Sequence, residues 1–156
     1  ENRMIGSCAL PLSLFQRMQQ VPMVWLQDSV ERRVERILRD YIVNLCAEFV
    51  AVQGEQGFSA FAERLLASLG NIQKRLGGDR HRRLMGILEA ALAEQARSGA
   101  VDLHRDWIEG LLREYYDPMY VYQREKKGLR IEFSGEQAAV VEYLRERAAS
   151  VGQPQQ

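Results

Sequence analysis

The sequence has few of the residues that build disulfide-rich or metal-binding proteins. Its 156 residues include two cysteines, Cys8 and Cys46, and two histidines, His81 and His104. The cysteines are far apart and form no Cys-x-x-Cys pair, which indicates reduced thiols rather than a disulfide framework. No His-Glu-x-x-His motif or facing cysteine pair accompanies the histidines, so we expect neither a metal ion nor a cofactor in this segment.

The sequence also lacks an excess charge of one sign and any long apolar run. Its 21 basic residues balance its 21 acidic residues, so any electrostatic binding site must be local. No apolar stretch reaches membrane-spanning length, and no signal-peptide pattern is present, which predicts a cytoplasmic protein that contacts no membrane. The first residue is Glu1 rather than methionine, so we expect the chain to begin inside a longer protein.

A complete active site is not visible in this sequence. It contains no Gly-x4-Gly-Lys-Ser/Thr phosphate loop. Cys46 falls at the edge of an apolar helical stripe, where a small buried thiol is the usual explanation. Cys8 has no histidine near it in the sequence. We therefore assign no catalytic residue to this chain.

Hydrophobic periodicity predicts a mainly α-helical fold with about seven helices and two short β-strands. We expect a single, mostly helical domain over residues 1–150 and a disordered tail over 151–156. A long helix should run from Asp28 to about Gln53, with one apolar stripe that includes Val34, Leu38, Tyr41 and Ile42. The strands should cover residues 21–26 and 129–133. Two strands either pair at the edge of the helical body or belong to a larger sheet, so self-association is a further expectation.

Polar residues predict where several helices begin. Asp28, with Glu31 three residues later, matches a capping box. Ser59, Asp79 and Asp102 should begin later helices. Asp117 followed by Pro118 predicts a break in the chain, with Asp117 capping a new helix that ends near Lys127.

The tract 115–127 holds four tyrosines and a proline beside a basic cluster. Exposed aromatic faces next to arginine and lysine suit an anionic, stackable ligand such as RNA, which makes Tyr116, Tyr120, Lys126 and Lys127 candidate binding residues. The alternative is a tyrosine-rich packing corner between two helices.

Two further basic groups are candidate anion sites. Arg32, Arg36 and Arg39 recur along one face of the long helix and form either a solvated face or a phosphate site. Arg80 and His81 lie in a basic helix start, where a bound phosphate would use free backbone amides. The alternative for this second group is a solvated charged turn.

Several ordered motifs resemble those of the bacterial tRNA 2-selenouridine synthase family, and the resemblance covers residues 1 to about 147. The motifs are residues 1–6 (Glu-Asn-Arg-Met-Ile-Gly), 11–15, 30–38, 74–78 (Lys-Arg-Leu-Gly-Gly), 88–92 and the tract 115–127. The chain resembles the family's C-terminal portion, which implies the last part of a larger P-loop-type α/β domain.

The resemblance implies a two-part enzyme with an N-terminal rhodanese-like domain and a P-loop domain. Its substrate would be tRNA carrying wobble 2-thiouridine, with geranyl diphosphate and selenophosphate as co-substrates for S-geranylation and selenium replacement. Neither cysteine of this chain matches the family's catalytic cysteine. Arg3, Arg33 and Arg36 match recurring basic positions of the family and would bind diphosphate or tRNA backbone.

The leading hypothesis is therefore a substrate-binding segment of a tRNA-modifying transferase, inactive on its own. A non-catalytic helical module that binds RNA or protein is one alternative. Half of a nucleotide-kinase-like phosphotransferase is the other, since its lid arginines would occupy positions like those of Arg33 and Arg36.

Overall fold

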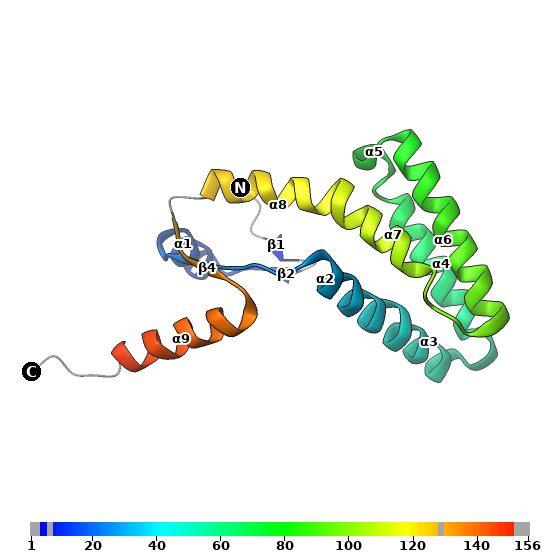
Figure 1. Ribbon diagram of the computed structural model, residues 1–156, viewed down its shortest axis with the longest axis horizontal. Coiled ribbons are helices and arrows are strands. Elements are labelled where there is room, and N and C mark those ends of the chain that lie inside the picture. The colour runs from blue at the N-terminus through cyan, green and yellow to red at the C-terminus, as the bar shows by residue number, and fades with distance from the viewer. Residues whose placement is uncertain (1–3, 6–7, 128–129, 152–156) are drawn as a thin grey trace, which may run out of the picture. The chain divides into compact units, whose positions relative to one another are not determined.

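A computed structural model describes residues 4–5, 8–127 and 130–151, with side chains described for 8–126 and 130–150. It confirms a mainly helical protein (Figure 1). The chain forms two compact units: unit 1 is Glu1–Asp28 with Arg124–Gln156, and unit 2 is Ser29–Gln123. The predicted tail lies outside the described residues from residue 152 onward.

Unit 2 is entirely helical in its described elements. Two long helices, each made of three successive segments, flank the shorter elements in sequence. In order the elements are α2 (Val30–Ile37), the π-helical segment η1 (Leu38–Asn44), α3 (Leu45–Gln53), the 3-10 turn η2 (Gly54–Gln56), α4 (Gly57–Gly70), α5 (Gln73–Leu76), α6 (Gly78–Ser98), α7 (His104–Leu111), the π-helical segment η3 (Leu112–Tyr116) and α8 (Asp117–Lys127). Segments α2, η1 and α3 form the first long helix, and α7, η3 and α8 form the second.

The apolar stripe predicted on the first long helix forms one side of the core. Val34, Leu38 and Ile42 are buried on it, and they belong to the same hydrophobic cluster as Phe61 of α4 and Leu84 of α6. Helices α4, α6 and α7 lie side by side (Figure 1). Every residue of this buried cluster belongs to unit 2. Burial of apolar area is the main favourable term in folding, so unit 2 holds the stabilising core.

The predicted helix starts are displaced by a few residues. Ser29, rather than Asp28, is the N-cap of α2, because its hydroxyl accepts the Arg32 backbone N–H at 3.2 Å. Helix α4 begins at Gly57 rather than after Ser59, and α6 begins at Gly78 next to Asp79. Helices α4 and α6 thus begin before the polar residue that the sequence pattern favours, whereas α2 begins after it.

Gly57 is required by the close approach of α4 to α3. A Cβ atom at this position would lie 2.4 Å from the Cα of Val50 and 2.6 Å from the carbonyl oxygen of Phe49. These are backbone atoms, which cannot move aside as a flexible side chain can. The turn between the two helices therefore accepts only glycine.

We expect Gly57→Ala to lower the free energy of unfolding by more than about 1 kcal/mol, since the new methyl group meets backbone atoms. Gly86→Ala is the matched control, because Gly86 lies inside α6 with nothing within 4 Å of its Cβ position. That control should raise stability by about 0.5–1 kcal/mol through helix propensity. Urea unfolding of both variants checks this, and an equal effect at the two positions would contradict it.

The predicted break at Asp117–Pro118 is wrong, because α7, η3 and α8 form one continuous helix. Asp117 has helical backbone angles, and its N–H donates to the carbonyl of Leu112, five residues earlier. Proline lacks an N–H and its ring crowds the preceding turn. The shifted hydrogen-bond pattern of the π-helical segment just before Pro118 lets the helix pass through this residue.

His104 is fully buried at the start of α7 and is held between two side chains. The Trp107 indole N–H donates to its Nδ1 at 2.9 Å, and its Nε2 lies 2.9 Å from Oε1 of Gln95. Indole only donates, so Nδ1 accepts and the proton of the neutral ring lies on Nε2. Burial lowers the pKa of His104 to about 4.

Folding therefore depends on pH through His104. The unfolded chain takes up a proton at this residue near pH 6.5, whereas the folded protein excludes it down to about pH 4. The contribution of neutral His104 to the free energy of unfolding is retained above pH 6.5. Between pH 6.5 and about pH 4 this free energy falls by up to roughly 1.4 kcal/mol per pH unit. Thermal unfolding between pH 7 and pH 5 should show this slope. His104→Gln, which cannot titrate, should show a much smaller slope, and equal slopes would contradict the assignment.

Unit 1 contains the strands and the remaining helices. Its elements are β1 (Met4–Ile5), β2 (Cys8–Ala9), α1 (Leu12–Gln20), β3 (Met23–Leu26), β4 (Ile131–Gly135) and α9 (Gln137–Val151), with the end of α8. The two predicted strands are confirmed as β3 and β4, and they pair in parallel with Val24 opposite Phe133. The short antiparallel pair β1–β2 was not predicted. Arg130 donates to the carbonyls of Met18 and Val21, which ties the end of α1 to the start of β4.

Candidate nucleic-acid interface

Four tyrosines of unit 2 lie near one another and form what we call the tyrosine cluster. The Tyr115 and Tyr116 rings meet edge to face, with centroids 4.9 Å apart. Burial, followed by the neighbouring phenols of Tyr115, Tyr120 and Tyr41, raises the pKa of Tyr116. The cluster therefore joins Tyr41 of η1, Tyr115 and Tyr116 of η3, and Tyr120 of α8.

The two π-helical segments account for how the cluster forms. Tyr41 lies in η1 and the Tyr115–Tyr116 pair lies in η3, so both segments contribute to the same surface. A π-helical turn rotates the following side chains relative to a regular helix, and such turns are frequent at functional sites. Tyr116 and Tyr120 are then four residues apart and share one face of the helix.

The cluster is exposed enough to meet a ligand. The exposed fraction is 60% for Tyr41, 48% for Tyr120 and 37% for Tyr116. If these rings served only to pack the core, neighbouring side chains would cover them. The alternative of a closed packing corner fits Tyr115, which is partly buried against the hydrophobic core, better than it fits Tyr41 or Tyr120.

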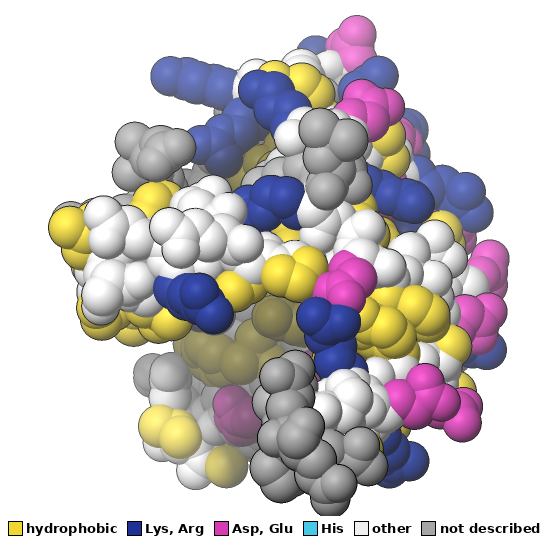
Figure 2. Space-filling view, turned by 90° about the vertical axis from the view of Figure 1, so that its left-hand side faces the viewer, with side chains coloured by type: hydrophobic (Ala, Val, Ile, Leu, Met, Phe, Trp, Pro, Cys, Tyr) yellow, Lys and Arg dark blue, Asp and Glu magenta, His cyan; other side chains and the backbone are white. Residues whose placement is uncertain are grey.

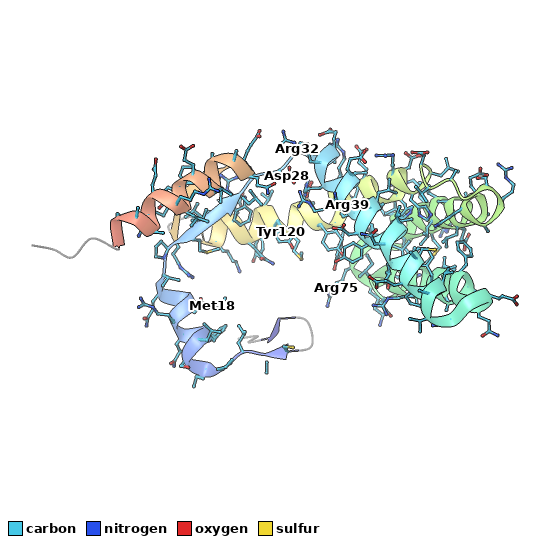
Figure 3. All side chains as sticks on the ribbon, turned by 90° about the horizontal axis from the view of Figure 1, so that it is seen from below. Met18, Asp28, Arg32, Arg39, Arg75 and Tyr120 are labelled. Carbon is cyan, nitrogen blue, oxygen red and sulfur yellow. The ribbon has the colours of Figure 1, made fainter. Side chains whose placement is uncertain are left out.

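Arg75 supplies a cation beside the cluster. Its Nη1 donates to the Tyr115 hydroxyl at 3.5 Å, and this contact raises the pKa of the guanidinium. Arg75 lies in the short helix α5 and projects outward, while Tyr120 is on α8 (Figure 3). A guanidinium next to exposed aromatic faces can bind a phosphate while a base stacks on a ring.

Further basic side chains surround Glu114, the residue just before Tyr115. Arg83 donates to Glu114, and Nε of Arg80 lies 3.7 Å from Oε2 of the same carboxylate. Arg80 and Arg83 are on the first turns of α6, which the short helix α5 precedes. Two arginines therefore share the Glu114 carboxylate, and Arg75 contacts the next residue, Tyr115, in a chain of zero net charge.

The other residues that the sequence singled out have varied positions. His81 is half-buried on α6, and its Nε2 is buried without a hydrogen-bond partner among the described residues. Arg36 is exposed on α2, and Lys126 is exposed at the end of α8 in unit 1. Arg3 and the side chain of Lys127 lie outside the described residues. Six of the predicted site residues therefore belong to unit 2: Arg33, Arg36, Arg80, His81, Tyr116 and Tyr120.

Sequence reasoning did not single out Tyr41 or Arg75 as candidate binding residues. Tyr41 was assigned to the buried stripe of the long helix because regular α-helical spacing places it beside Leu38 and Ile42. The π-helical segment makes it exposed instead. Arg75 was read only as part of a family motif.

Arg33 has an internal partner in unit 2. Its two terminal nitrogens donate to the two carboxylate oxygens of Asp117, at 2.5 and 2.9 Å, and both side chains are mostly buried. Asp117 therefore holds α2 against α8 instead of capping a helix. A bidentate arginine–carboxylate pair in this setting is stronger than an exposed ion pair.

We expect a double-mutant cycle of Arg33→Ala and Asp117→Ala to give a coupling energy of about 1 kcal/mol or more in chemical unfolding. The exposed neighbours Arg39 and Asp40, 2.9 Å apart, are the control pair and should couple by less than about 0.5 kcal/mol. Equal coupling in both pairs would show that the Arg33–Asp117 contact does not join the helices.

Cys8 and Cys46 are free thiols, and burial raises the pKa of Cys46, which keeps that thiol protonated. Within the described ranges, no group of three or more His, Cys, Asp or Glu side chains is placed to hold a metal ion. In the same ranges, no helix combines the length and apolarity needed to span a bilayer.

Comparison with known proteins defines the class of this chain. The sequence model of the family described as the tRNA 2-selenouridine synthase AAA domain matches residues 1–151. The chain belongs to this family.

Three curated relatives, each called tRNA 2-selenouridine synthase, match nearly the whole chain. Those of Pseudomonas fluorescens strains Pf0-1 and Pf-5 are 71% and 73% identical over 150 and 148 residues, which are 96% and 95% of this chain. That of Azotobacter vinelandii is 66% identical over 150 residues, 96% of this chain. The chain spans only 40–41% of the length of these relatives. No solved structure matches it.

Proposed function

We propose that the whole protein is a transferase that converts wobble 2-thiouridine of tRNA to 2-selenouridine by way of S-geranylation. Membership of the family and the names of the relatives support tRNA modification with selenium. Geranyl diphosphate and selenophosphate are the proposed co-substrates, and the proposed location is the cytoplasm. The groups that make and break bonds lie outside this segment in the proposal, so the chain alone is inactive.

Within that protein, the role of this segment is to bind tRNA. The observation that carries the proposal is the tyrosine cluster with Arg75 at its side. Every nucleobase has a flat π face, and an exposed phenol ring can stack on it. The modified uridine belongs to an anticodon loop, whose bases are unpaired and accessible to such stacking.

The charges near the cluster suit the RNA backbone. Arg75, Arg80 and Arg83 can contact phosphates, which fixes the position of the RNA without reading its sequence. On the face in Figure 2, basic side chains are interspersed with acidic and hydrophobic ones. Because the chain carries no net charge, binding depends on this local group rather than on long-range attraction.

Tyr120→Leu in the full-length protein tests the stacking role. Loss of one base stack should weaken tRNA binding by about 1–3 kcal/mol, roughly 5- to 150-fold. Tyr120→Phe keeps the ring and should bind nearly as well as the parent. Tyr122→Leu is the matched control: it lies on the same helix, is 56% exposed and points about 200° away. Filter binding or fluorescence anisotropy at fixed salt measures the affinities.

The pattern across the three variants decides the outcome. Equal affinities for Tyr120→Leu and Tyr122→Leu would remove the tyrosine cluster from the RNA interface. A loss in Tyr120→Phe as large as in Tyr120→Leu would show that the hydroxyl, not the ring face, makes the contact. Circular dichroism of each variant verifies that the helices are retained.

A further inference from the structure

Glu114 is an acidic residue that lies among the arginines beside the tyrosine cluster. Its two carboxylate oxygens hold one arginine each: Nη2 of Arg83 donates to Oε1, and Nε of Arg80 lies 3.7 Å from Oε2. The Glu114 side chain is 30% exposed, whereas those of Arg80 and Arg83 are 61% and 50% exposed. The carboxylate is therefore largely covered, while both guanidinium groups remain accessible to a ligand.

A carboxylate in this position opposes RNA binding unless it has a second effect. It repels phosphates, and its charge partly cancels the charge of the two arginines. An arginine side chain has many rotamers, however, and the freedom that it loses when it is ordered by a ligand weakens binding. A carboxylate that already holds the guanidinium group in one place reduces that loss.

The neighbouring ion pairs show that Glu114 holds a particular face of α6. Arg80 and Arg83 are three residues apart and share one face of the helix, and both meet Glu114 of η3. Arg82 lies between them in sequence and pairs with Asp79 of its own helix at 3.3 Å, where both side chains are exposed. Glu114 thus restrains, from a different element, the two arginines of a single face.

We propose that Glu114 is a positioning residue for the RNA backbone. It holds the guanidinium groups of Arg80 and Arg83 in the orientation in which they meet tRNA phosphates beside the tyrosine cluster. Glu114 adjoins Tyr115, whose hydroxyl accepts from Arg75 at 3.5 Å, so two consecutive residues of η3 restrain arginines of α5 and α6. Phosphate contacts and base stacking then have a defined relative position. This inference rests on the proposed tRNA binding and adds to it an acidic residue that favours the binding of an anion.

Glu114→Ala in the full-length protein tests the proposal through the sign of its effect. Loss of the carboxylate removes a repulsive charge, which alone would strengthen the binding of tRNA that carries wobble 2-thiouridine. If Glu114 positions the arginines, the affinity should instead fall roughly 3- to 10-fold, because two long side chains must then be ordered on binding. Glu114→Gln keeps a hydrogen-bond acceptor and should restore most of the lost affinity. Asp79→Ala is the matched control: it removes an exposed carboxylate from the start of α6 and should bind at least as tightly as the parent.

The same substitution in an Arg80→Ala/Arg83→Ala background separates positioning from a general effect on folding. A positioning residue acts through its partners, so Glu114→Ala should cause no further loss of affinity once both arginines are absent. A loss that persists in this background would overturn the inference, and so would a Glu114→Ala affinity equal to or above that of the parent; both results leave the proposed tRNA binding intact. Unchanged affinity in Arg80→Ala/Arg83→Ala would overturn the inference together with the proposed phosphate contacts. Fluorescence anisotropy at fixed salt measures all of these affinities.

Discussion

The contact between the two long helices of unit 2 determines where the tyrosine cluster lies. Two ion pairs connect them: Arg33 of α2 with Asp117 of α8, and Glu35 of α2 with Arg105 of α7. The first is mostly shielded from solvent, whereas the second is more exposed and contributes less. Because α2 leads directly into η1, and η3 leads directly into α8, the same contact fixes the relative position of the two π-helical segments.

The tyrosine cluster follows from this arrangement. A regular α-helix through residues 38–44 would direct Tyr41 differently, and a helix broken at Pro118 would separate Tyr120 from the Tyr115–Tyr116 pair. The π-helical segment η3 therefore has two effects: it lets the helix continue through Pro118, and it positions aromatic rings on the surface. Asp117 stabilises the same region through its ion pair.

The sequence contains enough information for the hydrophobic stripe, the two paired strands and the family. Val34, Leu38 and Ile42 recur at spacings that stay on one face even when one turn widens, so their burial was predictable. The continuous helix through Asp117 and Pro118 was not predictable, because the local sequence preferences of these two residues favour a helix cap and a break. The partner of Asp117 is Arg33, 84 residues away, and such a long-range contact leaves no local pattern. The exposure of Tyr41 depends on a π-helical turn, which has no distinctive sequence signal.

The division of stability between the units bears on how this part of the protein works. Unit 2 has a continuous hydrophobic core and can hold exposed tyrosines and arginines rigidly, which reduces the entropy lost when a ligand binds. Among the described residues, unit 1 has no buried side chain and therefore no comparable core. The tyrosine cluster lies in residues 29–123, which are also the part of the chain that contains the core. The rigid support for these exposed rings is therefore built from the same unit that carries them.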